Sequence, residues 1–231
     1  MKSFALPLML LVGCASDQDD FPVEPNGMEG TPPINGNTGE TFRARICVSD
    51  SIVDLTRCRS GGLAGFTVKL GSRSTTTDAT GAFELPAPTG TTTTPPFTVS
   101  GPGAVTTTTP FSPSLTLPVI DADVYARTMA SNQIFASTGT GAILGNVTRS
   151  GNAASDVVVT SNPTGSFMPL FDTDGTGFGT NATGARGVFW LPGIATGGAN
   201  LTFSDVGGET TVAGVQVVNG GVTILDSVVL P

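Results

Sequence analysis

Two carboxylates ahead of a glycine, Asp172 and Asp174 before Gly175, are the residues of this chain best spaced to hold a metal ion. Oxygen ligands two positions apart can face one cation, as at the start of a calcium-binding loop. No glutamate follows at the spacing that would complete such a loop, and Asp-Gly is also a frequent β-turn. Two interpretations therefore stay open, a calcium site at Asp172 and Asp174 or a plain turn, and no other cofactor is expected.

Catalytic groups are otherwise sparse. The chain has no histidine, which excludes Ser-His-Asp and Cys-His systems and removes the commonest general base near neutral pH. Paired carboxylates can act on glycosides, but Asp78 and Glu209 stand in turn-like contexts, and strand alternation would direct Glu84 to solvent. The glycine-rich segments lie between strand-like stretches, so they do not form a phosphate-binding loop. We therefore expect no enzymatic activity.

Cys14 closes the tetrapeptide Leu11-Val12-Gly13-Cys14 at the end of an apolar run over residues 4–12, and Lys2 precedes that run. The run is much shorter than the roughly 20 apolar residues of a membrane span, and Pro7 disfavours a buried helix. This is the pattern of a bacterial lipobox, in which a lipid is attached to the cysteine sulfur and the chain is cut just before it.

We therefore predict a signal peptide over residues 1–13 and a lipid on Cys14 that attaches an exported protein to a membrane. Ala15, in place of an aspartate after the cysteine, resembles the pattern of lipoproteins that move on to an outer membrane. The predicted location is the cell outer membrane, facing the periplasm or the surface.

Lipidation of Cys14 leaves Cys47 and Cys58 as a pair in an oxidising compartment, so we expect a disulfide between them. Closing a loop of this length contributes roughly 3 kcal/mol in the loop-entropy model. The bond would restrain an insert over residues 49–57, which we expect to be a flexible excursion from the first sandwich. A zinc site is the alternative, but the chain has no histidine and no fourth thiol.

Composition and charge indicate an acidic all-β protein. The chain has 10 Lys and Arg against 18 Asp and Glu, a net charge of −8, which disfavours nucleic acid as a partner. Its 31 glycines and 17 prolines, with many threonines, favour strands and turns. Residues 14–40 are rich in Asp, Glu, Pro and Gly and carry no basic residue. They are expected to form a linker, because they cannot bury enough apolar surface to fold.

The sequence beyond residue 40 repeats once, and each copy has a strand, a small-residue turn, a β-branched strand, a D/N-A-T-G turn and a strand ending in Leu-Pro. The turn is Asp78-Ala79-Thr80-Gly81 in the first copy and Asn181-Ala182-Thr183-Gly184 in the second. The second copy closes with strand patterns at 212–218 and 222–230 around Asn219-Gly220-Gly221, which predicts a hairpin.

This succession of strands and turns resembles the carboxypeptidase regulatory-like domains, whose fold is a transthyretin-like, seven-stranded β-sandwich. The resemblance implies two tandem sandwiches, over residues 41–125 and 140–231, with a connector over residues 126–139. Residues 121–132 are the one stretch that reads as a helix, capped by Asp121, and we expect a short connecting element there. Such domains are commonly accessory, so the resemblance speaks to fold more than to function.

Two classes of function follow. The first is a structural or interaction protein of the cell envelope, offering sheet edges or loops to another protein. The second is a carbohydrate-binding module, which needs an exposed aromatic platform. Trp190 is the single tryptophan, and if Phe189 and Leu191 face the core, Trp190 faces away from it. It would then serve as a polysaccharide platform or, alternatively, pack under a loop or against the other domain.

Overall fold

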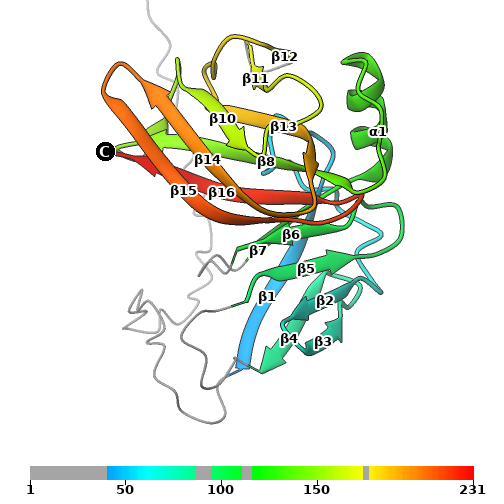
Figure 1. The fold of residues 1–231 in the computed structure, drawn as a ribbon. Coiled ribbons are helices and arrows are strands. Elements are labelled where there is room, and N and C mark those ends of the chain that lie inside the picture. Colours follow the sequence, from blue (N-terminus) through cyan, green and yellow to red (C-terminus); the bar gives the residue numbers. More distant parts are fainter. Residues whose placement is uncertain (1–40, 87–94, 111–115, 174–176) are drawn as a thin grey trace, which may run out of the picture. The chain divides into compact units, whose positions relative to one another are not determined.

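The computed structural model describes residues 41–86, 95–110, 116–173 and 177–231 (Figure 1). All of them belong to one unit of the chain, residues 34–231. Cys14, the predicted signal peptide, the predicted linker and Asp174 lie outside the described residues. Within the described part, no helix has the length and apolar character needed to cross a membrane.

The described residues between 41 and 120 form two facing sheets. One has the order β4-β1-β7, and the other contributes the order β3-β2-β5-β6. The strands are β1 (Thr41–Ser49), β2 (Thr67–Leu70), β3 (Arg73–Thr76), β4 (Ala82–Pro86), β5 (Phe97–Ser100), β6 (Thr107–Thr109) and β7 (Thr116–Ile120). Alternate residues of both sheets meet in one apolar cluster that includes Ile46, Phe83, Val68 and Phe97. This arrangement is a β-sandwich.

Residues 140–230 repeat the arrangement, with β12-β11-β13-β8-β16 facing β10-β14-β15. A second apolar cluster lies between these sheets and includes Val147, Phe189, Val159 and Phe203. The strands are β8 (Thr140–Arg149), β9 (Asn152–Ala153), β10 (Val158–Asn162), β11 (Leu170–Asp172), β12 (Phe178–Gly179), β13 (Val188–Ala195), β14 (Gly197–Asp205), β15 (Gly208–Val217) and β16 (Val222–Leu230). The predicted all-β sandwich class is confirmed.

The predicted closing hairpin is wrong. β15 pairs with β14, whereas β16 pairs in parallel with β8, so the two strands lie in different sheets. The Asn219-Gly220 turn is held by the start of β8: Asn219 Oδ1 accepts from the Gly139 N–H at 2.9 Å, and the Gly220 N–H donates to Thr140 O at 2.8 Å. A turn anchored to a third strand lets the chain cross between sheets, which local alternation does not reveal.

The two halves are joined edge to edge. β6 runs in parallel beside β16, with Thr107 opposite Val222 and Thr108 opposite Thr223, which makes a continuous ten-stranded sheet (Figure 1). The Val222 N–H also donates to Thr106 O at 2.9 Å. The tandem division into 41–125 and 140–231 stays a prediction, and within the described residues the halves share this sheet.

One helix, α1 (Ala122–Ser131), follows the first half. The Asp121 side chain caps it by accepting from the Asp123 and Val124 N–H groups at 2.9 and 3.2 Å, as predicted. Its Tyr125 and Met129 side chains pack against a third apolar cluster, which lies outside both sandwich cores. The helix therefore covers one face of the second half.

Candidate functional site

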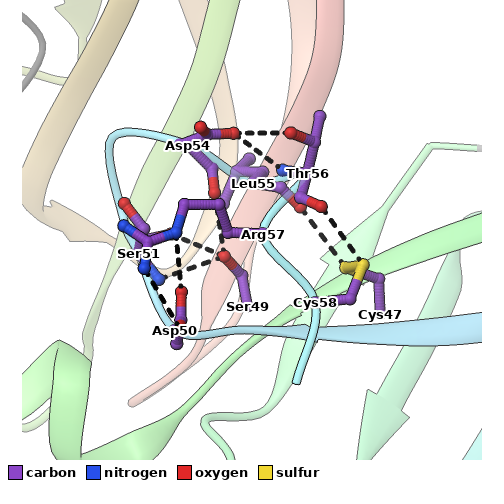
Figure 2. Close-up of a disulfide and its surroundings, with 9 residues drawn as sticks. All are labelled: Cys47, Ser49, Asp50, Ser51, Asp54, Leu55, Thr56, Arg57 and Cys58. Carbon is purple, nitrogen blue, oxygen red and sulfur yellow. Dashed lines mark hydrogen bonds and ion pairs between the residues drawn. A yellow bond between two sulfur atoms is a disulfide. The ribbon is translucent and has the colours of Figure 1, made fainter. Parts of the chain in front are cut away.

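A network of hydrogen bonds and ion pairs holds the disulfide-closed insert (Figure 2). Cys47 and Cys58 are bonded, with Cα atoms 5.0 Å apart, as predicted. Ser49 Oγ lies within hydrogen-bond distance of two carbonyl oxygens of the loop, Ser51 O at 2.7 Å and Asp54 O at 3.0 Å. Ser49 itself is fully buried.

The insert is not the flexible excursion expected from the sequence. Ile52 is only 4% exposed and belongs to the third apolar cluster, together with Leu144 and Ile224 of the second half. Val53 and Leu55 pack against the same cluster. Turn residues surround this short apolar run in the sequence, and burial across the two halves explains why such residues occur in an insert.

An ion pair ties the insert to the second half. Arg186 lies 2.6 Å from the Asp54 carboxylate. The Thr56 hydroxyl, which donates to Asp54 at 2.6 Å, and then the Arg186 guanidinium hold the pKa of Asp54 below its ordinary value. The sequence singles out neither Asp54 nor Arg186, because residues 132 positions apart share no local signal.

Trp190 is fully buried, which corrects the expectation of an exposed sugar platform. It does point away from Phe189 and Leu191, which belong to the sandwich core, as alternation predicted. However, its ring lies 5.9 Å from that of Tyr125 in α1 and 5.4 Å from that of Phe178. The alternative left open by the sequence, packing under neighbouring elements, is the one observed.

Tyr125 of α1 is half-buried in the layer that covers Trp190. Burial raises the pKa of its phenol to about 12, because the phenolate is poorly solvated there. The layer formed by the insert, α1 and the outer face of the second half thus encloses Trp190, with Tyr125 and Phe178 half-buried beside it. We call it the seam.

Asp172, one of the two predicted calcium ligands, is 1% exposed and occupied by backbone donors. Its carboxylate accepts from the N–H groups of Gly184 at 2.9 Å, Arg186 at 2.9 Å and Val188 at 2.8 Å. A Cβ on Gly184 would lie 2.1 Å from Thr173 O, so this turn can approach Asp172 only with glycine there. Asp172, the member of the predicted calcium pair that the structure describes, therefore holds a turn through backbone hydrogen bonds.

In the first half, the carboxylate that holds the equivalent turn comes from the turn itself. There, the carboxylate of Asp78 accepts from the N–H groups of Thr80 at 2.8 Å and Ala82 at 3.0 Å. The hydrogen bonds of the Thr80 hydroxyl and N–H hold the pKa of Asp78 below its ordinary value. In both halves a carboxylate accepts from the first residue of the strand that follows, Ala82 of β4 or Val188 of β13.

These contacts correct the repeat alignment. The hydroxyl of Thr77 accepts from the Phe66 N–H and donates to Leu63 O, and Thr183 does the same with Val157 and Ala154. Thr77 is therefore equivalent to Thr183, which places Asp78 opposite Gly184 and Gly81 opposite Gly187. The two D/N-A-T-G turns are therefore shifted by three positions, whereas the first strands, the β-branched strands and the Phe-x-Leu-Pro strands align as predicted.

Other candidate carboxylates lie apart in ordinary surface roles. Glu84 forms an exposed ion pair with Arg43 at 2.9 Å, and Glu209 accepts from the Ser204 hydroxyl at 3.2 Å. No group of three or more potential metal ligands occurs in the part of the chain that the structure describes. Two cavities among those residues measure about 90 and 50 Å³, whereas small-molecule sites usually occupy ~300–1,000 Å³.

Comparisons with known proteins identify no family. No family model matches the chain, and no curated protein matches it. Among solved structures, it is similar to the Bacillus anthracis TIE protein, with 13% identity, a TM-score of 0.25, and coverage of 81% of this chain and 34% of that one. It is also similar to a streptococcal ancillary pilin, with 10% identity, a TM-score of 0.21, and coverage of 81% and 62%. The chain thus spans about a third and three fifths of those proteins, and the fold assignment rests on its own geometry.

Proposed function

We propose that this chain is a lipid-anchored, non-enzymatic protein of the cell envelope in which two β-sandwiches work as one structural or protein-interaction module. The observation that carries this proposal is the coupling of the two halves through the seam and the shared sheet. The insert, α1 and the β6–β16 pairing fix the halves to each other by apolar packing, backbone hydrogen bonds and the Asp54–Arg186 pair. Such coupling suits a stiff spacer or display module.

The finer parts of the proposal come from the sequence. Cys14 would carry the lipid, residues 14–40 would hold the module away from an outer membrane, and both halves would be carboxypeptidase regulatory-like sandwiches. The expected partner is another envelope protein, bound at a sheet edge or a loop. Burial of Trp190 removes the residue on which a polysaccharide platform would have relied.

Metabolic labelling of the full chain with a palmitate analogue tests the anchor. Cys14→Ala is expected to abolish both labelling and membrane retention, because the sulfur that accepts the lipid is absent. Cys58→Ala, which also removes one sulfur but leaves the lipobox intact, is the matched control and should keep both. Labelling or membrane retention that persists in Cys14→Ala would refute the lipid anchor.

A further inference from the structure

Among the described residues, no strand pairs with the outer edge of β10, whereas β3 covers the equivalent edge of β2 in the first half. In the first half, β3 pairs with the edge of β2, and Thr77 continues that ladder by pairing with Phe66. In the second half, Thr183 pairs with Val157 in the same way. The chain before Thr183 then turns away to form β12, which pairs with β11, so no described strand continues along β10.

The repeat also shows which backbone groups the open edge presents. In the first half, Val68 lies opposite Thr75 in the β2–β3 ladder, two residues after Phe66. Because hydrogen-bonding direction alternates along a strand, the equivalent Val159 and then Ser161 direct their N–H and C=O groups away from β14. The Ser161 C=O already accepts from the Thr164 hydroxyl at 3.5 Å, so a pairing strand would use its second lone pair.

The residues of β10 itself include no charge or proline that would discourage pairing, and Pro163 follows its last residue. Val158 is 40% exposed, Thr160 is exposed, and no charged residue occurs anywhere from residue 157 to 171. Natural proteins usually protect free edges with charges, prolines or bulges. β15 has such protection, since it carries Glu209 and is bulged beside Gly214, which has φ +70°. β3, at another edge, carries Arg73.

We propose that β10 pairs antiparallel with β10 of a second copy of this chain, with Thr160 of the two copies facing each other across a twofold axis. Val159 of each copy then lies opposite Ser161 of the other, and the two pairs exchange four backbone hydrogen bonds. The paired strands are uncharged, so no like charges oppose each other. The chain already joins its own halves by edge pairing at β6–β16.

The contact is small, because five residues a side bury much less than the ~800 Å² per partner of a standard interface. Two copies therefore associate weakly when dilute and pair readily when concentrated. The pairing does not depend on the lipid anchor, so it can be tested in a soluble chain.

Cysteine cross-linking tests the geometry. In the full chain with Cys14→Ser, Thr160→Cys puts two thiols at facing, non-hydrogen-bonded positions, where Cβ atoms are close enough for a disulfide. We expect a covalent dimer that forms roughly tenfold faster than with Val206→Cys, a matched control at a fully exposed turn residue. Equal rates for the two variants would overturn the proposal. Cross-linking of Thr160→Cys to a different protein, when tested in cells, would overturn it in favour of a foreign strand.

A proline test separates edge pairing from random collision. Ser161→Pro removes an N–H that points out of the sheet and leaves the β10–β14 ladder intact. Added to Thr160→Cys, it should reduce dimer formation to the Val206→Cys level while circular dichroism stays native. If this proline disturbs folding, Thr160→Lys serves instead, and it should sediment as a monomer where the parent chain dimerises. An unchanged dimer in the folded variant would refute the pairing.

Discussion

At the scale of single residues, the two halves differ in the residue whose carboxylate accepts hydrogen bonds from the turn before β4 or β13. In the first half the turn provides its own, Asp78, and in the second half Asp172 reaches in from β11. The second arrangement buries the charge and requires glycine at position 184. Burying a carboxylate is tolerable only when donors surround it, and the three N–H groups at Asp172 meet that condition.

Asp172→Asn is therefore expected to destabilise the fold by about 3 kcal/mol, because an amide NH₂ would face backbone donors that need an acceptor. Urea unfolding measures the change. Asp78→Asn is the matched control: it alters the equivalent carboxylate at an exposed turn, and its loss should be much smaller. A calcium-dependent rise in wild-type stability that Asp172→Asn abolishes would instead favour the cation site.

At the scale of elements, the insert between Cys47 and Cys58 acts as a tie between the halves. Its disulfide limits the loop at one end, while Ile52 and Asp54 contact the second half at the other. A restrained loop loses less entropy when it docks, so the disulfide and the packing of Ile52 support each other.

Cys58→Ser is expected to lower the free energy of unfolding by about 3 kcal/mol. It should also increase the exposure of Trp190 to acrylamide, because the insert that helps to close the seam is freed. Trp190 is the single tryptophan of the chain, so its fluorescence reports this layer alone. Arg57→Ala, which removes only the exposed ion pair with Asp50, should change neither property. Unchanged quenching in Cys58→Ser would show that the insert stays docked without the bond.

At the scale of the whole molecule, the shared sheet and the seam predict that the two halves unfold together. Phe66 is fully buried in the first-half core, and Trp190 belongs to the second half. Phe66→Ala should cost about 3–5 kcal/mol and shift the unfolding transition seen by Trp190 by the full amount. Two calorimetric transitions, or a Trp190 transition that ignores Phe66→Ala, would show independent halves.

Much of the fold was accessible to sequence reasoning because it depends on local rules. Alternation placed Glu84 outward and Trp190 on the opposite face from Phe189, and Asp121 marked the start of α1. The disulfide could be predicted because two cysteines remain after Cys14 and an oxidising compartment was expected. Where the prediction failed, as for the closing hairpin and the exposure of Trp190, the deciding contact came from a segment distant in sequence.

The strand class, the helix cap, the disulfide and the order of strands in the repeat could be predicted from the residues alone, because periodicity, capping and turn chemistry act over a few residues. The folded chain was needed to see that β15 and β16 belong to different sheets, that the insert packs over the second half, that Asp172 replaces Asp78 and that no described strand pairs with the outer edge of β10. These features depend on which distant segments pack together, because that packing decides which side chains are buried and which strand edges are paired.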